Sequence, residues 1–257
     1  MLLAIDIGNT NTVFGLFSDE NLIQKWRLNS DKNKNSEIYA VDIIELFLTN
    51  SIDCLKISGV IISSVVPSLT SVISDAVKKF YNGEVLILGE KSVKLDIYIQ
   101  VKNKKEVGFD RLVNSICGYK KFGGNLIIVD FGTATPFDVV GENGEYLGGV
   151  ISPGVNLSIK ILHDMTAQLP KIQLKKQEHV IGKSTFEAIN SGIYFGYISL
   201  VEGLIKRIKD EYGKEMKVII TGGLLSVFEN SIPEVNYVEP DLTLEGLRMI
   251  YQNNQAL

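Results

Sequence analysis

The first 90 residues alternate between short apolar runs, polar turns and two stretches of helical spacing. Residues 2–5 are continuously apolar, which is typical of a buried strand, and residues 13–17 and 22–28 predict two further strands. Apolar positions at helical spacing follow Ser36, which we expect to cap a helix. A strand at 57–63, a helix at 67–81 and a strand at 84–88 complete a βββαβαβ order. This order predicts an open sheet flanked by helices.

The turn after the first strand carries the residue types of a phosphate site. Asp6 places a carboxylate at the strand end, and Gly8 and Asn9 are residues that tolerate the positive φ needed to aim N–H groups at an anion. Thr10 and Thr12 add hydroxyl donors. A carboxylate in this setting suits a phosphate tail whose magnesium ion needs an oxygen ligand. On these residues alone, an ordinary hairpin remains the alternative.

A second segment repeats the same pattern further along the chain. Residues 125–135 again give an apolar strand, an aspartate (Asp130), a glycine two residues later and a hydroxyl-rich turn, at an offset of 130 − 6 = 124 residues. At this offset the next polar turn, residues 19–21, falls on residues 143–145. One offset shared by a strand and two turns predicts two copies of one unit. Two such loops could together hold one nucleotide.

The remainder of the second half predicts helices that begin or end at glycine-rich turns. We expect helices at about 155–165, from Ser184 to near 213 and at about 241–252, and a strand at 217–221 that runs into Gly222. Ser184 and Glu187 have the spacing of a capping box. The run 182–185, Gly-Lys-Ser-Thr, is not a P-loop, because that motif needs a glycine where Gln177 stands.

Residues 108–111, Gly-Phe-Asp-Arg, begin a predicted helix with an acid followed by a base. Asp110 is explained by the helix dipole, which favours an anion in the first turn. Arg111 is not, because a cation there is mildly unfavourable. The pair therefore indicates a functional role.

Composition and charge exclude several classes of protein. The 257 residues, 45% of them hydrophobic, suffice for two domains of ordinary size. A net charge of −4 argues against a nucleic-acid partner recognised by a basic face. With no apolar run of 18 residues and no signal-peptide pattern at the N-terminus, we expect no membrane span. Cys54 and Cys117 predict free thiols in a cytoplasmic protein, and two histidines are too few for a zinc site.

Taken together, these motifs resemble the acetate and sugar kinase/Hsp70/actin superfamily, and within it the type III pantothenate kinases. The resemblance rests on residues 6–10, 108–111, 130–135, 148–154, 169–170, 182–185 and 221–223, in the family's order. It implies an α/β fold of two ribonuclease H-like lobes with mixed sheets flanked by helices, expected at 1–120 and 121–257. It also implies transfer of a phosphoryl group from ATP to pantothenate, the first step of coenzyme A biosynthesis, by an enzyme that is typically a homodimer.

The resemblance also assigns roles to individual residues. Asp110 would be the general base for the pantothenate hydroxyl and Arg111 would bind the pantothenate carboxylate, roles that fit their chemistry. The expected acceptor site further includes Gly108, Phe109 and Thr185. ATP would contact Thr133 and the loop made of Asp6, Ile7, Gly8, Asn9, Thr10, Asn11, Thr12 and Val13. Asp6 would hold Mg²⁺, and Asp130 would hold a monovalent cation, K⁺ or NH₄⁺.

Three features depart from the family pattern. Phe109 stands where a small residue is usual, so the pocket beside Asp110 is expected to be narrower or differently lined. Pro136 stands where threonine is usual, and because proline lacks an N–H donor this strand position is expected to be unpaired or irregular. Residues 98–104 lack the usual Asn-Pro, and Tyr98 is the nearest aromatic.

Other functions on the same fold stay open at this stage. One is a regulatory or accessory protein that binds ATP without phosphorylating pantothenate, which loss of Asp110 would have favoured. Another is an actin-like or chaperone-like ATPase, for which 257 residues leave little room. A third is a kinase with another small hydroxylated acceptor, because a fold does not fix a substrate.

Overall fold

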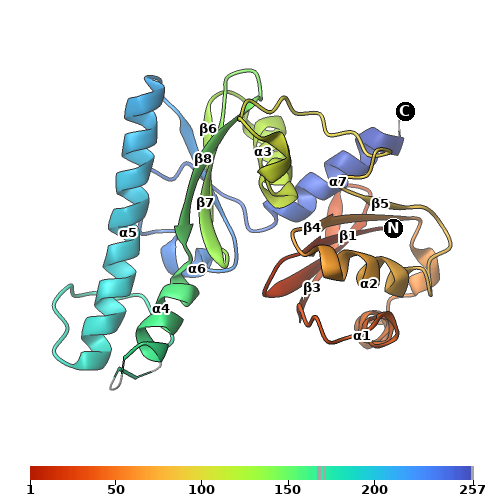
Figure 1. Ribbon diagram of the computed structural model, residues 1–257, viewed down its shortest axis with the longest axis horizontal. Helices are drawn as coiled ribbons and strands as arrows, with labels where there is room; N and C mark the ends of the chain where they lie inside the picture. The colour runs from red at the N-terminus through yellow and green to blue at the C-terminus, as the bar shows by residue number, and fades with distance from the viewer. Residues whose placement is uncertain (167–168, 171, 256–257) are drawn as a thin grey trace. The chain divides into compact units, whose positions relative to one another are not determined.

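Two five-stranded sheets form the framework of the computed structural model, which describes residues 1–166, 169–170 and 172–255 (Figure 1). The chain divides into two units. The first comprises Met1–Ile97, Asn103–Cys117 and the segment from Leu242 onward; the second comprises Tyr98–Lys102 and Gly118–Asp241.

The sheet of the first unit has the strand order β3-β2-β1-β4-β5. Its strands are β1 (Leu2–Ile7), β2 (Asn11–Ser18), β3 (Asn21–Asn29), β4 (Gly59–Ser64) and β5 (Val85–Ile87). The helices are α1 (Ser36–Thr49), α2 (Pro67–Val77), α3 (Phe109–Phe122) and α7 (Leu242–Gln255), with short 3₁₀ turns at Cys54–Lys56 and Lys104–Glu106. The five strands expected from the apolar runs of this half are all present.

The sheet of the second unit has the order β10-β9-β6-β7-β8. Its strands are β6 (Leu126–Asp130), β7 (Ala134–Val140), β8 (Tyr146–Pro153), β9 (Lys217–Thr221) and β10 (Tyr237–Val238). The helices of this unit are α4 (Val155–Asp164), α5 (Thr185–Tyr212) and α6 (Leu225–Phe228), and the last residues of α3 also belong to it.

The two sheets share one topology, which confirms the predicted duplication. In each, a meander of three antiparallel strands (β1-β2-β3 and β6-β7-β8) is extended beside its first strand by two parallel strands. Leu2 and Leu126, the first residues of β1 and β6, are separated by 126 − 2 = 124 residues, the offset found in the sequence.

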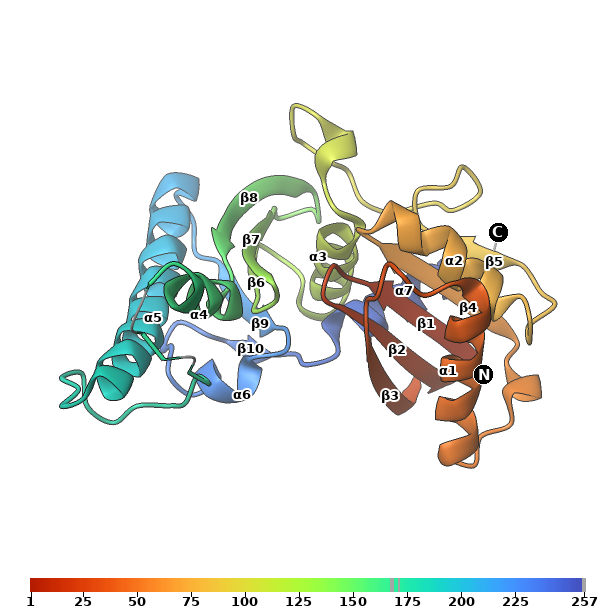
Figure 2. The same cartoon turned by 60° about the horizontal axis from the view of Figure 1, so that its bottom comes forward.

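Helices cover both faces of the first sheet, which explains why β1 is apolar throughout (Figure 2). Leu3, Ile5 and Ile7 pack in a core with α1 and α2. Leu2 and Ala4 point to the opposite face and pack with apolar side chains of α3 and α7. A strand buried on both faces needs no polar alternation.

The boundaries of the units differ from the expected 1–120 and 121–257 in two places. Helix α7 belongs to the first unit, because Leu244, Leu247 and Ile250 complete the core on the Leu2 face of the sheet. Residues 98–102 belong to the second unit, where Ile99 forms a parallel bridge with Tyr146 at the start of β8. Both are pairings between distant segments that local pattern cannot reveal.

Helix ends follow the expected chemistry with small corrections. Asn35, not Ser36, caps α1, and its side chain accepts from the N–H of Ile38. Helix α2 ends at Val77 rather than at residue 81. At the start of α5, Ser184 accepts from the N–H of Glu187 as predicted, but the Glu187 carboxylate accepts from Lys183 N–H, so the capping box is shifted by one residue.

Pro136 lies within β7 beside the end of a ladder. The pairing of β6 with β7 stops at Val129 opposite Phe137, one residue short of Pro136, while β8 continues to pair there. Pro136 is thus unpaired on the β6 side but in register with Ile151 on the β8 side, so the expected unpaired position is found toward one neighbouring strand only.

One described helix, α5, has the length and apolar composition of a membrane span, although the sequence contains no uninterrupted apolar run of that length. In Figure 1 it lies along one face of the second sheet, where Tyr197, Val201 and Ile205 join the core of this unit. A core helix meets the same criteria, so its composition is weak evidence for a membrane.

The placement of α7 generates the first prediction. Leu247 is fully buried on the Leu2 face of the first sheet, so Leu247→Ala should lower the free energy of unfolding by about 2–5 kcal/mol. Hydrogen exchange should show that protection is lost in β1 and β4 before β6 and β9. The exposed Asn253→Ala on the same helix is the control, expected within about 0.5 kcal/mol of wild type. Equal loss of protection in both sheets would contradict the assignment of α7 to the first unit.

Candidate active site

Asp6 lies at the carboxyl end of β1 and points to the face covered by α3 and α7. Its register partners are Val13 on β2 and Ser63 on β4. Because Ile5 and Ile7 point to the α1 and α2 face, the alternation of the strand turns Asp6 the other way, and its side chain is partly buried. The Asp6 carboxylate therefore lies at the carboxyl end of the central strand, on the face of the first sheet that α3 and α7 cover.

The turn that follows Asp6 is closed by its own hydrogen bonds. Gly8 N–H donates to the carbonyl of Asn11 at 3.0 Å, and the Ser30 hydroxyl donates to the carbonyl of Gly8 at 2.6 Å. Neither Gly8 nor Asn9 has positive φ, so that expectation was wrong, and the Gly8 N–H is engaged within the turn. Asn9 and Thr10 are exposed at its tip.

Three other residues that were expected to contact ATP are buried or partly buried in the first unit. Ile7 is fully buried in the core, and Val13 is partly buried opposite Asp6. Thr12 is fully buried, and its hydroxyl lies 3.0 Å from the Ser30 hydroxyl. The side chain of Thr12 therefore supports the turn. Sequence reasoning missed Ser30, because nothing near it in the chain marks it as a partner of a turn 20 residues earlier.

Asp110 occupies the first turn of α3, with its carboxylate folded back over Gly108. The N–H of Arg111 donates to Asp110 Oδ1 at 2.9 Å. A β-carbon at residue 108 would lie 2.4 Å from the same oxygen, which explains why this position is glycine. Burial raises the pKa of Asp110 above its ordinary value of 3.8, against the opposing effects of the Arg111 N–H and charge.

The ring of Phe109, the residue before Asp110, has two sets of packing contacts. The ring packs against the core that α3 and α7 share with the first sheet. It also covers Gly89, where a β-carbon would meet Phe109 Cζ at 2.7 Å and where φ is +97°. The larger residue at this position is thus accommodated by a glycine in the loop after β5.

The turn that follows Asp6 and the residues Gly108–Arg111 lie at the same end of the first sheet. Val65, which follows β4, donates its N–H to the carbonyl of Ile7 at 3.0 Å. A β-carbon on Gly108 would lie 3.5 Å from Val65 Cγ1. Val65 therefore connects the end of β1 with the start of α3, and the first unit presents two carboxylates, Asp6 and Asp110, on one face at one end of its sheet.

In the second unit, backbone from three segments surrounds the end of β6. Asp130 is partly buried, and Thr133 is exposed in the turn that follows. A β-carbon on Gly222, where φ is +102°, would lie 2.4 Å from Asp130 Oδ1. A β-carbon on Gly154, just before α4, would lie 2.1 Å from the carbonyl oxygen of Thr133. The turn is thus packed between two glycines, whose role in shaping it the sequence did not reveal.

Two further residues lie apart from this turn within the second unit. Thr185 is exposed at the first position of α5. Tyr98, which is 64% exposed, accepts from the N–H of Tyr146 and so lies at the end of β8 remote from Pro153 and the Thr133 turn.

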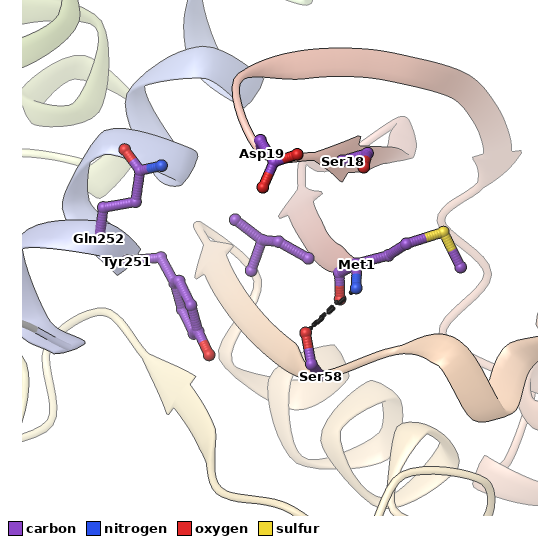
Figure 3. Close-up of a pocket in the computed structure, with 7 residues that line it drawn as sticks. Met1, Ser18, Asp19, Ser58, Tyr251 and Gln252 are labelled. Atoms are coloured by element: carbon purple, nitrogen blue, oxygen red, sulfur yellow. Dashed lines mark hydrogen bonds between the residues drawn. The ribbon is translucent and has the colours of Figure 1, made fainter.

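The first unit also has a small cavity of about 190 Å³, at the other end of β1 from Asp6 (Figure 3). Its lining includes Asp19, Ser58, Tyr251 and Gln252, together with Met1, whose ammonium group donates to the Ser58 hydroxyl at 3.1 Å. It contains none of the predicted site residues.

Within the described residues, no group of three or more histidine, cysteine, aspartate or glutamate side chains could hold a metal ion by itself. Mg²⁺ does not require such a group, because it is usually held by one or two carboxylates together with phosphate oxygens of the substrate. Asp6 fits that role, because its carboxylate is partly buried at a strand end and lies beside a turn with an exposed tip.

Comparison with known proteins identifies the family. A family model described as type III pantothenate kinase matches residues 2–207. The chain is 42% identical over 256 residues to the type III pantothenate kinase of Paramagnetospirillum magneticum, covering 100% of this chain and 98% of that protein. The chain belongs to the type III pantothenate kinase family. Members of this family are enzymes that phosphorylate pantothenate with ATP in coenzyme A biosynthesis.

Solved structures support the fold. A Campylobacter jejuni protein named for the Baf family of transcriptional activators has a TM-score of 0.61 at 21% identity, covering 99% of this chain and 100% of that one. A Sinorhizobium meliloti protein named for 2-dehydro-3-deoxygalactonokinase has a TM-score of 0.60 at 9% identity, with 100% of both chains covered. At these identities the likeness establishes a two-lobed sugar-kinase-like fold, as predicted.

The glycine that packs on Asp130 generates a prediction for this pantothenate kinase. Gly222→Ala should displace the Asp130 carboxylate and the adjoining Phe131 backbone and weaken binding of an ATP analogue at least tenfold, measured by calorimetry, because the added carbon would lie 2.4 Å from Asp130 Oδ1 and 2.6 Å from the Phe131 nitrogen. Gly123→Ala is the matched control: Gly123 also has positive φ, +59°, but nothing lies within 4 Å of its β-carbon. If both variants lose the same affinity, backbone strain and not the Asp130 contact is responsible.

Proposed function

We propose that this chain transfers the γ-phosphoryl group of ATP to the primary hydroxyl of pantothenate, forming 4′-phosphopantothenate, with Asp110 as the general base. The observation that carries the mechanism is the setting of Asp110, a partly buried carboxylate at the same end of the first sheet as Asp6. Family membership supports the substrate pair.

The raised pKa of Asp110 suits proton transfer. A base accepts a proton best when its pKa approaches the working pH, and burial moves Asp110 in that direction. The nearby Arg111 N–H and charge act against this rise of the pKa and favour the ionised carboxylate. As phosphoryl transfer proceeds, Asp110 takes the hydroxyl proton of the acceptor.

Arg111 is proposed to bind the pantothenate carboxylate. A guanidinium group pairs bidentately with a carboxylate, and Arg111 follows Asp110 directly at the start of α3. Gly108 and Phe109 shape this segment through the contacts with Asp110 and Gly89. Thr185 is proposed as a further acceptor contact on the strength of its exposure and its match to the family motif.

The nucleotide is proposed to bind through both Asp-x-Gly loops. Asn9 and Thr10 are exposed at the tip of the first, and Thr133 is exposed in the second, so their side chains are accessible to phosphate oxygens. Mg²⁺ held by Asp6 would neutralise charge on those oxygens. Asp130 would hold the K⁺ or NH₄⁺ ion, a role that its partly buried position at the end of β6 supports.

A homodimer is proposed from apolar side chains exposed on the second unit. Ile161 on α4 is 50% exposed, Met165 after it 80%, and Ile181 before α5 83%, and Phe186 on α5 is 45% exposed. Helices α4 and α5 are in contact, and exposed apolar side chains on neighbouring helices are typical of a protein–protein interface. Sedimentation of Ile161→Glu against wild type tests it, with a shift to monomer expected. A cytoplasmic location is proposed from the two free cysteines.

Asp110→Asn should lower kcat roughly a hundred- to ten-thousandfold, the usual contribution of a general base. Pantothenate affinity, measured calorimetrically with a non-hydrolysable ATP analogue, should change far less, because the carboxylate grip remains. Asp75→Asn, an exposed aspartate on α2, is the control and should keep full activity.

The coupled assay is run with and without pantothenate, in sodium and then in potassium. A near-normal kcat in Asp110→Asn would reject Asp110 as the base, and equal wild-type rates in both salts would reject the cation.

Arg111→Gln should move the acid limb of the pH profile of kcat/KM to higher pH. The Arg111 charge lowers the pKa of Asp110, so removing it leaves burial less opposed and the pKa rises further. The protonated, inactive form of the base then persists to a higher pH. The KM for pantothenate should rise as well. An acid limb that stays in place or moves to lower pH would show that another group limits the rate.

A further inference from the structure

Ser63 on β4 has a fully buried hydroxyl for which the described residues supply no hydrogen-bond partner. Buried hydroxyl groups nearly always have one, because leaving a donor unsatisfied costs stability. The next residue, Ser64, shows the usual situation: it accepts from the N–H of Val66 and from the Thr70 hydroxyl at the start of α2. The unsatisfied hydroxyl of Ser63 is therefore not explained by the packing of the described residues.

Ser63 lies directly beside Asp6. The two residues are register partners in the parallel pairing of β1 with β4, whose backbones are about 4.8 Å apart. Ile62 packs on the α1 and α2 face and Ile61 on the α3 and α7 face, so alternation puts Ser63 on the latter. Asp6 points to that face as well. The serine hydroxyl and the aspartate carboxylate are thus neighbours on one side of the sheet.

We propose that Ser63 is a positioning residue for Asp6: its hydroxyl donates a hydrogen bond to the Asp6 carboxylate when that carboxylate holds Mg²⁺. The inference rests on the proposed role of Asp6. Groups that donate a hydrogen bond to the carboxylate ligand of a metal ion fix the orientation of that ligand. Ser63 is next to Asp6, and its hydroxyl has no other hydrogen-bond partner among the described residues.

The test measures metal binding directly. Mn²⁺, as a probe for Mg²⁺, is titrated with ADP present and free Mn²⁺ is followed by electron paramagnetic resonance. Ser63→Ala should bind Mn²⁺ about 10- to 100-fold more weakly, the usual effect of losing a group that orients a metal ligand. Ser74→Ala is the matched control, because Ser74 on α2 also has a buried hydroxyl without a partner among the described residues, but packs on the opposite face of the same sheet.

The double variant separates positioning from a structural effect. If Ser63 acts through Asp6, Asp6→Asn combined with Ser63→Ala should bind no more weakly than Asp6→Asn alone. One outcome would overturn the role of Ser63 and leave that of Asp6: Ser63→Ala binds Mn²⁺ as tightly as Ser74→Ala does, while Asp6→Asn binds Mn²⁺ weakly. If Asp6→Asn itself binds Mn²⁺ like wild type, the proposed metal site fails and the inference with it. Melting temperatures near wild type for both serine variants exclude unfolding as the cause.

Discussion

The parallel pairing of a central strand with its neighbour, β1 with β4 and β6 with β9, determines where the chemistry of this protein lies. Each pair is buried on both faces, so polar side chains emerge only where the strands end. Asp6 and Asp130 occupy those ends in the two units. Because the two sheets have one topology, the same constraint acts twice, and a duplicated fold yields two carboxylates with equivalent positions in their own sheets.

Glycine backbone holds the acidic groups of the proposed site in place. Gly108 makes room for the Asp110 carboxylate, and Gly222 lies against that of Asp130. In each case a single added carbon would meet a carboxylate oxygen at 2.4 Å. A side chain at either glycine position would therefore displace the carboxylate. The positions of both carboxylates therefore depend on the absence of a side chain at residues 108 and 222.

Much of this arrangement could be predicted from the sequence, because it depends on local pattern or on repetition. Continuous apolar runs gave the central strands, and the 124-residue offset gave the duplication. What failed depends on distant contacts or on backbone detail. The sequence pattern of α7 predicts a helix but not the sheet on which it packs, and only its contacts in the fold assign it to the first sheet. Gly8 and Asn9 permit positive φ, but the hydrogen bond from Gly8 to Asn11 selects another turn. Ser30 and Ser63 are ordinary serines until the fold brings them beside Thr12 and Asp6.

The membership of α7 in the first unit has a consequence for synthesis. A ribosome makes residues 1–97 well before residues 242–255, yet Leu2, Ala4 and Ile61 share their core with Leu244 and Leu247, which are made only after the whole of residues 118–241. Apart from residues 98–102, the second unit is one continuous segment, which leaves the ribosome complete while the first is still missing a helix. The first unit therefore completes its core after the second, and its apolar sheet face must avoid aggregation while residues 118–241 are being made.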